Sequence, residues 1–262
     1  MTQKVDIDKV NEVAVKAGYA ILDIYYDANF SQVVDFKADD SPLTMADQAA
    51  HNVITPDLEE LYSSIPVISE EGKDTPYSDR RDWEYFWLVD PLDGTKEFIK
   101  RNGQFTVNIA LIHRNRPVAG VIYAPVTKEL YFATQEAYTN AHPGTYKRTD
   151  GGDTTRLRVR SLTENRVAVR SSSHASEEED AVLRRHNVVK SIARGSSLKF
   201  CMIAEGQADV YYRHGPTMEW DTAAGQAIVE GAGGKVFQET SERPFIYNKE
   251  SLRNSSFLVL AS

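Results

Sequence analysis

"WLVDPLDGTKEF", residues 87–98, joins a strongly apolar run to two closely spaced aspartates, Asp90 and Asp93. The apolar run predicts a buried strand, and Pro91 and Gly94 predict a sharp turn directly after it. Taken alone, the pattern D-x-x-D-G has two interpretations. It is an ordinary turn, because Asp-Pro and Asp-Gly are common turn dipeptides. Alternatively it is a site, because a carboxylate at the mouth of a core is costly unless it has a partner.

Composition and length are those of a globular protein. The chain has 262 residues, of which 41% are hydrophobic and 26% charged, so it is long enough to bury a large core. No stretch approaches 18 consecutive apolar residues, and the start lacks a continuous apolar segment, so we expect neither a membrane span nor a signal peptide. The single cysteine, Cys201, cannot form an internal disulfide, which suits a reducing cytosol.

The charge balance limits the partners. The formal net charge is −8, and no extended basic run is present, so we expect no nucleic-acid partner. An acidic protein that binds a phosphorylated small molecule needs a local source of positive charge. Bound metal ions would supply it.

The hydrophobic pattern predicts alternating helices and strands, with layers of sheet and helix. We expect helices at 5–26, from Ser41-Pro42 to 62, at 196–206 and at 221–231. We expect strands at 66–69, 84–89, 105–113, 117–125, 129–134, 156–160, 166–170, 188–192, 208–212, 235–238 and 256–261, the third to fifth forming an antiparallel meander. The Gly-, Thr- and Pro-rich stretch 136–155 predicts a loop and a boundary. It divides the chain into an N-terminal α+β half, 1–155, and a C-terminal α/β half, 156–262, with the active site between them.

Three further acidic positions stand out. In "VISEEG" an apolar strand ends in Glu70 and Glu71, and only one of two adjacent side chains can reach a shared site. In "MEWDTAAGQAIVEGAGG" Asp221 precedes a helical run, where an aspartate most often caps the helix. Asp47 in "LTMADQAA" is by default a helix-surface acid. Each position has an ordinary structural interpretation when it is taken alone.

The oxygen ligands that these acids share favour Mg²⁺ over zinc. Carboxylates and backbone carbonyls are hard oxygen ligands suited to Mg²⁺. The six histidines have no metal-binding spacing and Cys201 stands alone, so a zinc site is disfavoured. Two Mg²⁺ ions about 4 Å apart support in-line attack of water on phosphorus.

Three motifs in order, "VISEEG", "WLVDPLDGTKEF" and "MEWDTAAGQAIVEGAGG", resemble those of the inositol monophosphatase superfamily. The resemblance covers nearly the whole chain. It implies an α/β fold, a layered α-β-α-β-α sandwich, and a Mg²⁺-dependent, lithium-sensitive phosphatase. "DPLDGTKEFI", "GSSLKFCMIAEGQADVY" and "GPTMEWDTAAGQAI" resemble in particular the bacterial 3'(2'),5'-bisphosphate nucleotidase branch.

The resemblance also implies roles for individual residues. Glu70 is expected to bind the first Mg²⁺ and Asp90 to bridge two metals, with the Leu92 carbonyl as a further ligand. Asp93 and Asp221 are expected to hold the second metal, and Glu71 to bind a third, weaker one or to tune the site. Asp47 and the Thr95 hydroxyl are expected to orient and deprotonate the attacking water. The substrate is expected to contact Glu70, Leu92, Asp93, Gly94, Thr95 and Asp221, with the N–H groups of Gly94 and Thr95 facing the phosphate at a helix start.

The implied reaction is hydrolysis of the 3'-phosphate of adenosine 3',5'-bisphosphate to AMP and phosphate, by attack of metal-activated water. The alternatives are an inositol or sugar phosphatase, or an idle metal- or nucleotide-binding protein. Segment 194–199, "RGSSLK", either meets the second phosphate or caps a helix, and Lys96 either serves the nucleotide or is solvated. The aromatic residues Tyr211, Tyr212 and Trp220 favour core positions over adenine binding. We expect a cytoplasmic protein, and peripheral attachment to the inner membrane stays open. The choice between monomer and homodimer is also open.

Overall fold

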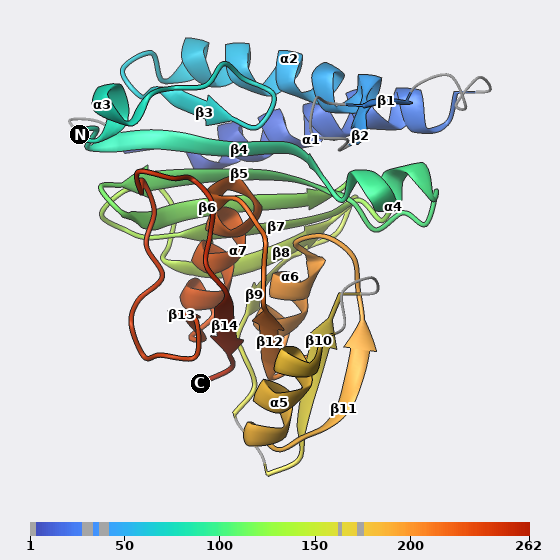
Figure 1. Cartoon of the computed structure of the whole chain (residues 1–262). Helices are drawn as coiled ribbons and strands as arrows, with labels where there is room; N and C mark the ends of the chain where they lie inside the picture. Colours follow the sequence, from blue (N-terminus) through green and yellow to red (C-terminus); the bar gives the residue numbers. More distant parts are fainter. Residues whose placement is uncertain (1–3, 28–33, 37–41, 162–163, 172–175) are drawn as a thin grey trace.

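The computed structural model describes residues 4–27, 34–36, 42–161, 164–171 and 176–262. Helices and strands stack in five layers, which confirms the α-β-α-β-α sandwich (Figure 1). The order is a helical layer, a seven-stranded sheet, a second helical layer, a five-stranded sheet and a last helix.

The first layer consists of α1 (Ile7–Tyr25) and α2 (Met45–Leu61). The side chain of Asp6 caps α1 by accepting a hydrogen bond from the Asp8 N–H, and the apolar spacing places one face of the helix in the core. The predicted start of the second helix is wrong. Ser41 lies outside the described residues, and Pro42–Thr44 forms strand β2, paired with β1 (Val34–Phe36). The φ angle that proline fixes suits an extended strand as well as a first helical turn. α2 then continues through Pro56 without interruption.

The large sheet has the strand order β3-β4-β5-β6-β7-β8-β9. Its strands are β3 (Val67–Ser69), β4 (Tyr85–Asp93), β5 (Thr106–His113), β6 (Arg116–Ala124), β7 (Glu129–Thr134), β8 (Gly144–Thr149) and β9 (Thr154–Leu157). β3 and β4 are parallel, and all later neighbours are antiparallel, so the predicted meander is confirmed. The predicted loop 136–155 is wrong in part, because β8 and the start of β9 lie within it.

Strand β4 does not end where the apolar run ends. It continues to Asp93 through a β-bulge, in which two residues of β4, Pro91 and Leu92, lie between the pairs Asp90–Asn108 and Asp93–Thr106. Proline is tolerated at a bulge because the ladder needs no N–H there, and bulges re-aim side chains beside functional sites. Gly94 follows with φ +95° and starts the short helix α4 (Thr95–Ile99).

The second sheet has the order β11-β10-β12-β14-β13. Its strands are β10 (Arg166–Arg170), β11 (Val188–Ala193), β12 (Val210–Arg213), β13 (Lys235–Gln238) and β14 (Phe257–Leu260). Helices α6 (Leu198–Ala204) and α7 (Glu219–Gly231) cover one face, and α5 (Glu177–Arg185) covers the other. α6 and α7 were predicted, whereas α5 was not, and α3 (Tyr77–Arg80) is a single turn after β3.

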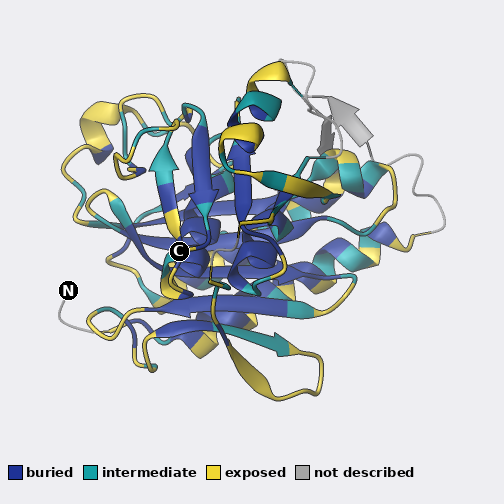
Figure 2. Ribbon diagram, turned by 90° about the horizontal axis from the view of Figure 1, so that it is seen from below, coloured by how far each residue is buried: buried dark blue, intermediate teal, exposed yellow. Residues whose placement is uncertain are grey.

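Three apolar cores hold these layers together. Alternate residues of β4 serve different cores: Trp87 and Val89 face α1 and α2, and Phe86 and Leu88 face α6 and α7. A smaller core joins α5 to the outer face of the second sheet. In Figure 2 the central strands are buried, and exposed residues gather in loops and on outer helix faces.

A glycine allows a close contact between the large sheet and α7. A Cβ atom on Gly120 of β6 would lie 2.8 Å from the Ala224 carbonyl oxygen and 2.9 Å from the Ala227 Cβ. α7 therefore packs directly on the backbone of the large sheet. The division of the chain at 155/156 stays a prediction; β9 runs two residues past it, to Leu157.

Candidate active site

Three predicted carboxylates from separate elements form one cluster. Glu70 directly follows β3, Asp90 lies in β4, and Asp221 lies in the first turn of α7. One oxygen from each lies within 4.8 Å of the other two. Among the described residues, this is the one group of three or more His, Cys, Asp or Glu side chains with metal-binding proximity. The cluster thus joins two residues from the β3 and β4 region of the large sheet to one residue of α7.

Burial makes the cluster electrostatically unfavourable without a cation. Burial raises the pKa of Asp90 well above its usual range, and the nearby charge of Glu70 raises it further, followed by those of Asp93, Asp221 and Asp47. Burial and then Asp93 raise the pKa of Asp221 in the same way, although the Met218 N–H opposes the rise. A hard divalent cation removes this repulsion, and the all-carboxylate donor set fits Mg²⁺.

The bulge in β4 orients Asp90. The Leu92 N–H donates to Asp90 Oδ1 at 3.1 Å, which closes a tight turn over the bulge. The Leu92 side chain is buried in the core beneath α1 and α2. An apolar residue inside an acidic motif therefore anchors the loop.

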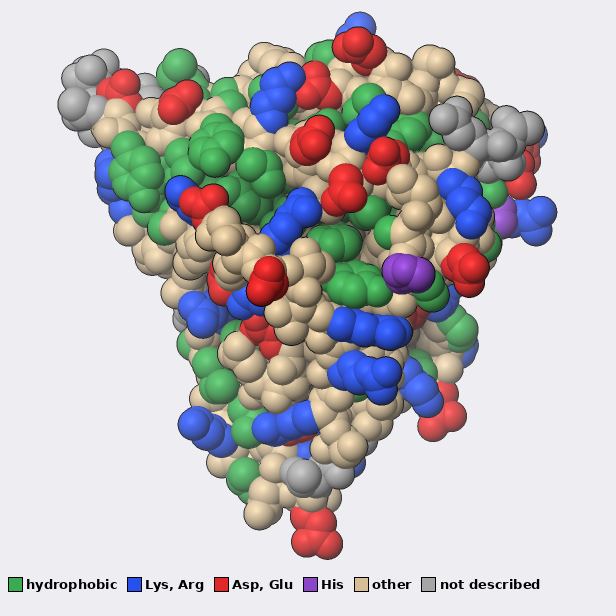
Figure 3. All heavy atoms as spheres, turned by 180° about the vertical axis from the view of Figure 1, so that it is seen from behind, with side chains coloured by type: hydrophobic (Ala, Val, Ile, Leu, Met, Phe, Trp, Pro, Cys, Tyr) green, Lys and Arg blue, Asp and Glu red, His purple; other side chains and the backbone are tan. Residues whose placement is uncertain are grey.

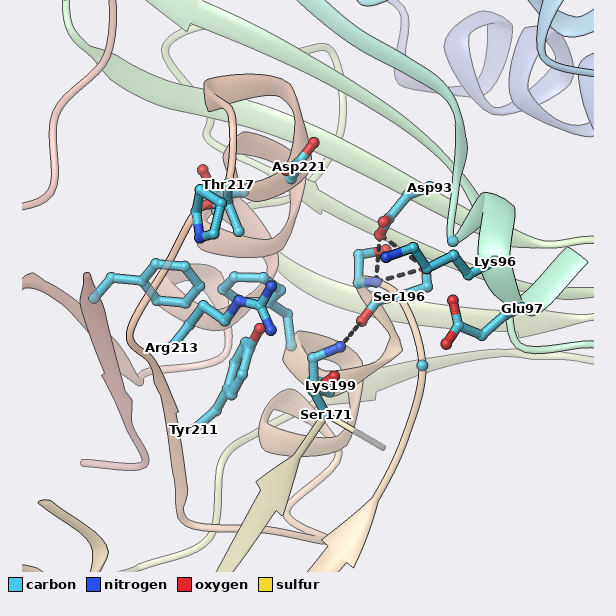
Figure 4. Close-up of a pocket in the computed structure, with 17 residues that line it drawn as sticks. Asp93, Lys96, Glu97, Ser171, Ser196, Lys199, Tyr211, Arg213, Thr217 and Asp221 are labelled. Atoms are coloured by element: carbon cyan, nitrogen blue, oxygen red, sulfur yellow. Dashed lines mark hydrogen bonds between the residues drawn. The ribbon is translucent and has the colours of Figure 1, made fainter. Parts of the chain in front are cut away.

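Asp93 lies outside the group of three, but it lines a cavity together with Asp221. Its Oδ2 accepts hydrogen bonds from Ser196 Oγ at 2.8 Å, the Ser197 N–H at 2.5 Å and Asn108 Nδ2 at 3.4 Å. Figure 4 shows Asp93 and Asp221 on one side of the cavity, with Ser196 next to Asp93. The serines precede α6, so Asp93 is held by residues from the second part of the chain.

Asp47 and Thr95 lie in contact. Thr95 Oγ1 donates to Asp47 Oδ1 at 3.4 Å, and Asp47 is buried in the first turn of α2. The contact is long for a hydrogen bond between oxygens, as catalytic contacts often are without substrate. Gly94 is required beside them: its φ is positive, and a Cβ would approach the Gln104 carbonyl oxygen to 3.1 Å.

Three basic residues line the cavity. Lys199 and Arg213 lie across it from Asp221, together with Tyr211, whereas Lys96 lies beside Asp93 (Figure 4). Lys199 donates to the Ser196 carbonyl oxygen at 2.5 Å, and burial lowers the pKa of its ammonium group to about 8. The buried Nε of Arg213 has no hydrogen-bond partner among the residues that the structure describes. The cavity thus places Lys199 and Arg213 across from Asp221, which suits a polyanion held beside metal ions.

Other candidates from the sequence lie elsewhere. Arg194 lines a different hollow with Glu205 and Lys147, so of the two basic residues in the 194–199 segment only Lys199 reaches the cavity. Trp220 packs against the central core and Tyr212 belongs to the core beneath α5, whereas Tyr211 is both buried and cavity-lining. Glu71 is not part of the carboxylate cluster.

Arg213 was missed by the sequence analysis. Its signal was available, because it ends the apolar strand "VYY" just as Glu70 ends "VIS". A charged residue at the end of a buried strand is a candidate for a site whatever its sign.

The face of the molecule in Figure 3 is not uniformly acidic. On the face in Figure 3, acidic and basic side chains mix over the upper part, and basic side chains gather lower down. The absence of a nucleic-acid partner therefore stays a prediction. None of the helices in the described ranges has the length and apolarity needed to cross a membrane.

A layered α/β fold with a carboxylate cluster between its large sheet and α7 defines a class of metal-dependent phosphatases. The chain belongs to the inositol monophosphatase family, whose sequence profile matches residues 3–259. The 3'(2'),5'-bisphosphate nucleotidase CysQ of Escherichia coli strain K12 is 44% identical over 255 residues, covering 97% of this chain and 98% of the relative. CysQ of Salmonella typhimurium strain LT2 is 44% identical over 254 residues, covering 97% and 98%.

Solved structures agree. The crystal structure of CysQ from Bacteroides thetaiotaomicron has a TM-score of 0.82 and 45% identity, covering 98% of this chain and 97% of that one. An inositol monophosphatase from Thermotoga maritima has a TM-score of 0.75 at 21% identity, covering 97% and 91%, and shares the fold.

Proposed function

We propose that this protein is a Mg²⁺-dependent 3'(2'),5'-bisphosphate nucleotidase that converts adenosine 3',5'-bisphosphate to AMP and phosphate. The observation that carries the proposal is the cavity between the carboxylates Asp93 and Asp221 and the cations Lys199 and Arg213. The names of the CysQ relatives support the substrate.

The carboxylate cluster supports a set of metal ligands. Glu70, Asp90 and the Leu92 carbonyl would hold one Mg²⁺, and Asp90, Asp93 and Asp221 a second. Glu71 would bind a third, weaker ion or only tune the site. When bound, the ions neutralise phosphate charge, lower the pKa of water and stabilise the leaving oxygen. The chain itself supplies the dry, fixed arrangement of oxygen ligands.

Asp47 and Thr95 act on the attacking water. Since Thr95 Oγ1 donates its own proton toward Asp47 Oδ1, its lone pair is available to accept a hydrogen bond from water. As the water attacks phosphorus, its proton moves to Thr95 Oγ1 and the Thr95 proton moves to Asp47. The buried carboxylate is the final acceptor. The bond between phosphorus and the ribose 3'-oxygen breaks, and the departing 3'-oxygen of AMP takes a proton from solvent.

The two phosphates of the substrate would lie at opposite ends of the cavity. The reacting 3'-phosphate lies by the acids, where the N–H groups of Gly94 and Thr95 face it. The 5'-phosphate lies by Lys199 and Arg213, and the buried Arg213 Nε, which has no partner in the described part of the chain, gains one. A single phosphate leaves these cations unpaired, so the cavity favours a bisphosphate.

The test is phosphate release from adenosine 3',5'-bisphosphate, inositol 1-phosphate and fructose 1,6-bisphosphate at equal concentration, with Mg²⁺ and after chelation. We expect the highest kcat/KM for the nucleotide and no activity after chelation. Preference for either competitor makes the protein an inositol or sugar phosphatase with the same metal chemistry. Binding without turnover of any of the three makes it an idle binding protein.

Two further expectations belong to this function. Li⁺ should inhibit hydrolysis, and insensitivity would count against the proposed metal ligands. A cytoplasmic location, with or without peripheral attachment to the inner membrane, stays a prediction that cell fractionation tests.

A further inference from the structure

Two buried charged residues outside the carboxylate cluster converge on one short segment. This segment, residues 248–250, lies in the long connection between β13 and β14, which in Figure 1 runs in red from the five-stranded sheet to the end of the seven-stranded sheet. Arg80 contacts it from the first part of the chain, and Glu219 contacts it from α7.

Arg80 is 3% exposed and ends α3, ten residues after Glu70. Its Nη1 donates to Asn248 Oδ1 and to the Lys249 carbonyl oxygen, each at 2.8 Å, and its Nη2 donates to the Glu250 carbonyl oxygen at 2.9 Å. Asn248 returns a hydrogen bond from Nδ2 to the Arg80 carbonyl oxygen at 2.9 Å. The guanidinium therefore fixes three consecutive residues of the segment.

Glu219 is fully buried and begins α7, two residues before Asp221. Its Oε2 accepts from the Asn248 N–H at 2.7 Å, and its Oε1 accepts from the Lys249 N–H at 3.0 Å and Lys249 Nζ at 2.6 Å. The Glu219 N–H also donates to the Leu252 carbonyl oxygen at 2.9 Å. The start of α7 is thus held to the same segment that Arg80 holds.

We propose that Arg80 and Glu219 are positioning residues for the metal cluster, acting through the 248–250 segment. The cluster's acids come from different elements and repel one another when no cation is present. The Arg80–segment–Glu219 network connects the chain just after Glu70 to the helix that presents Asp221. It keeps the ligands at binding distance before the metal arrives. This inference rests on the proposed metal site.

The experiment measures metal binding without substrate. Mn²⁺, as a Mg²⁺ surrogate, is titrated calorimetrically into wild type, Arg80→Lys and Asn248→Gly. Lysine keeps the charge but loses the planar fork, and glycine keeps the left-handed backbone that Asn248 adopts at φ 60° while removing both side-chain bonds to Arg80. Arg81→Lys is the matched control, because Arg81 is exposed and forms a surface ion pair with Asp82.

We expect both variants to raise the Kd for Mn²⁺ by about 10–100-fold, the usual effect of losing a residue that orients metal ligands. Excess metal should restore their kcat, and Arg81→Lys should match wild type. If Asn248→Gly lowers the Tm but leaves the Kd unchanged, the network is only structural and the inference is wrong. Absence of Mn²⁺ binding by wild type would instead overturn the proposed function.

Discussion

Asp90 meets two opposing demands at one position. Its carboxylate is 1% exposed and surrounded by four other acids, which raises its pKa, yet it must be ionised to bind a cation. The β4 bulge and the Leu92 N–H hold it in place despite this cost. Asp90 therefore lowers the stability of the metal-free protein, and the same carboxylate raises the affinity for metal.

Asp90→Asn should separate these effects. Without a bridging carboxylate, kcat should fall by about a thousand-fold, since metal ions contribute several kcal/mol to the transition state. In the absence of metal the variant should have a higher Tm than wild type, because one buried like charge is gone. Phosphate release and thermal melts after chelation measure the two effects.

The matched control is Asp82→Asn, at a side chain that is 85% exposed. It should change neither the activity nor the metal-free Tm. Retained turnover in Asp90→Asn would contradict the bridging role.

Thr95→Val tests the water-activating pair. Valine keeps the shape but removes the hydroxyl that contacts Asp47, so kcat should fall by about 10²–10⁴-fold, the usual range for general base catalysis. The Mn²⁺ affinity should change little. Thr95→Ser restores a hydroxyl and should recover most of the rate; if serine is as inactive as valine, proton transfer through Thr95 is wrong.

Lys199 predicts a pH dependence. Burial lowers its pKa from 10.5 to about 8, so the ammonium charge is present below that pH and is lost above it in the free protein. Because kcat/KM reports the free enzyme, its value for adenosine 3',5'-bisphosphate should fall as the pH rises through about 8.

Lys199→Arg keeps a charge at all accessible pH values, and it should remove this decline. Inositol 1-phosphate lacks the second phosphate, so any activity toward it should not follow the same curve. A decline that persists in Lys199→Arg would assign the titration to another group.

At the level of single residues, the sequence predicted the acids of the site but did not show which side chains they would contact. Glu70, Asp90 and Asp221 each follow or begin an apolar element, and only the fold shows that their oxygens meet. Arg194 and Lys199 look equivalent in the sequence, yet the turn before α6 directs them to different hollows.

Elements with a strong apolar period were predicted well, and the others were not. α1 and the strands from β4 to β7 carry buried residues at regular spacing. α5 opens with four consecutive acids and buries few apolar side chains, so its pattern is weak, although Ser176 caps it by accepting from the Glu179 N–H. β8 is a polar strand bordered by Pro143-Gly144 and Gly151-Gly152, which indicate turns.

The contact between β6 and α7 yields a prediction for a whole element. Gly120→Ala would push a methyl group against the Ala224 carbonyl oxygen and the Ala227 Cβ, so α7 must shift. The free energy of unfolding should fall by about 1–3 kcal/mol, the usual cost of overpacking. Urea denaturation measures this change.

Because α7 carries Asp221, the same variant should also bind Mn²⁺ more weakly. Val189→Ala, at a strand position that is 66% exposed, is the control and should alter neither quantity. A stable Gly120→Ala protein would show that the sheet backbone yields in place of the helix.

At the scale of the molecule, metal should stabilise the fold. The ligands come from the large sheet and from α7 in the second helical layer, so a bound ion joins the two layers and stabilises only the folded chain. At 100 times its Kd, an ion adds about 2.7 kcal/mol. For a chain of this size that corresponds to a rise in Tm of roughly 5–10 °C.

Thermal melts with Mg²⁺ and after chelation measure the shift, with equal ionic strength supplied by KCl as the control. The shift should be much smaller in Asp90→Asn. An unchanged wild-type Tm at saturating Mg²⁺ would contradict a metal site that spans these elements.

The carboxylates lie far apart in the sequence, so the ribosome synthesises them at different times. During translation Glu70 and Asp90 emerge first, and at roughly 5–20 residues per second Asp221 follows many seconds later. A nascent chain on the ribosome therefore holds only part of its catalytic apparatus. Hydrolysis requires α7, which carries Asp221. A prematurely terminated product that lacks this helix should therefore be inactive.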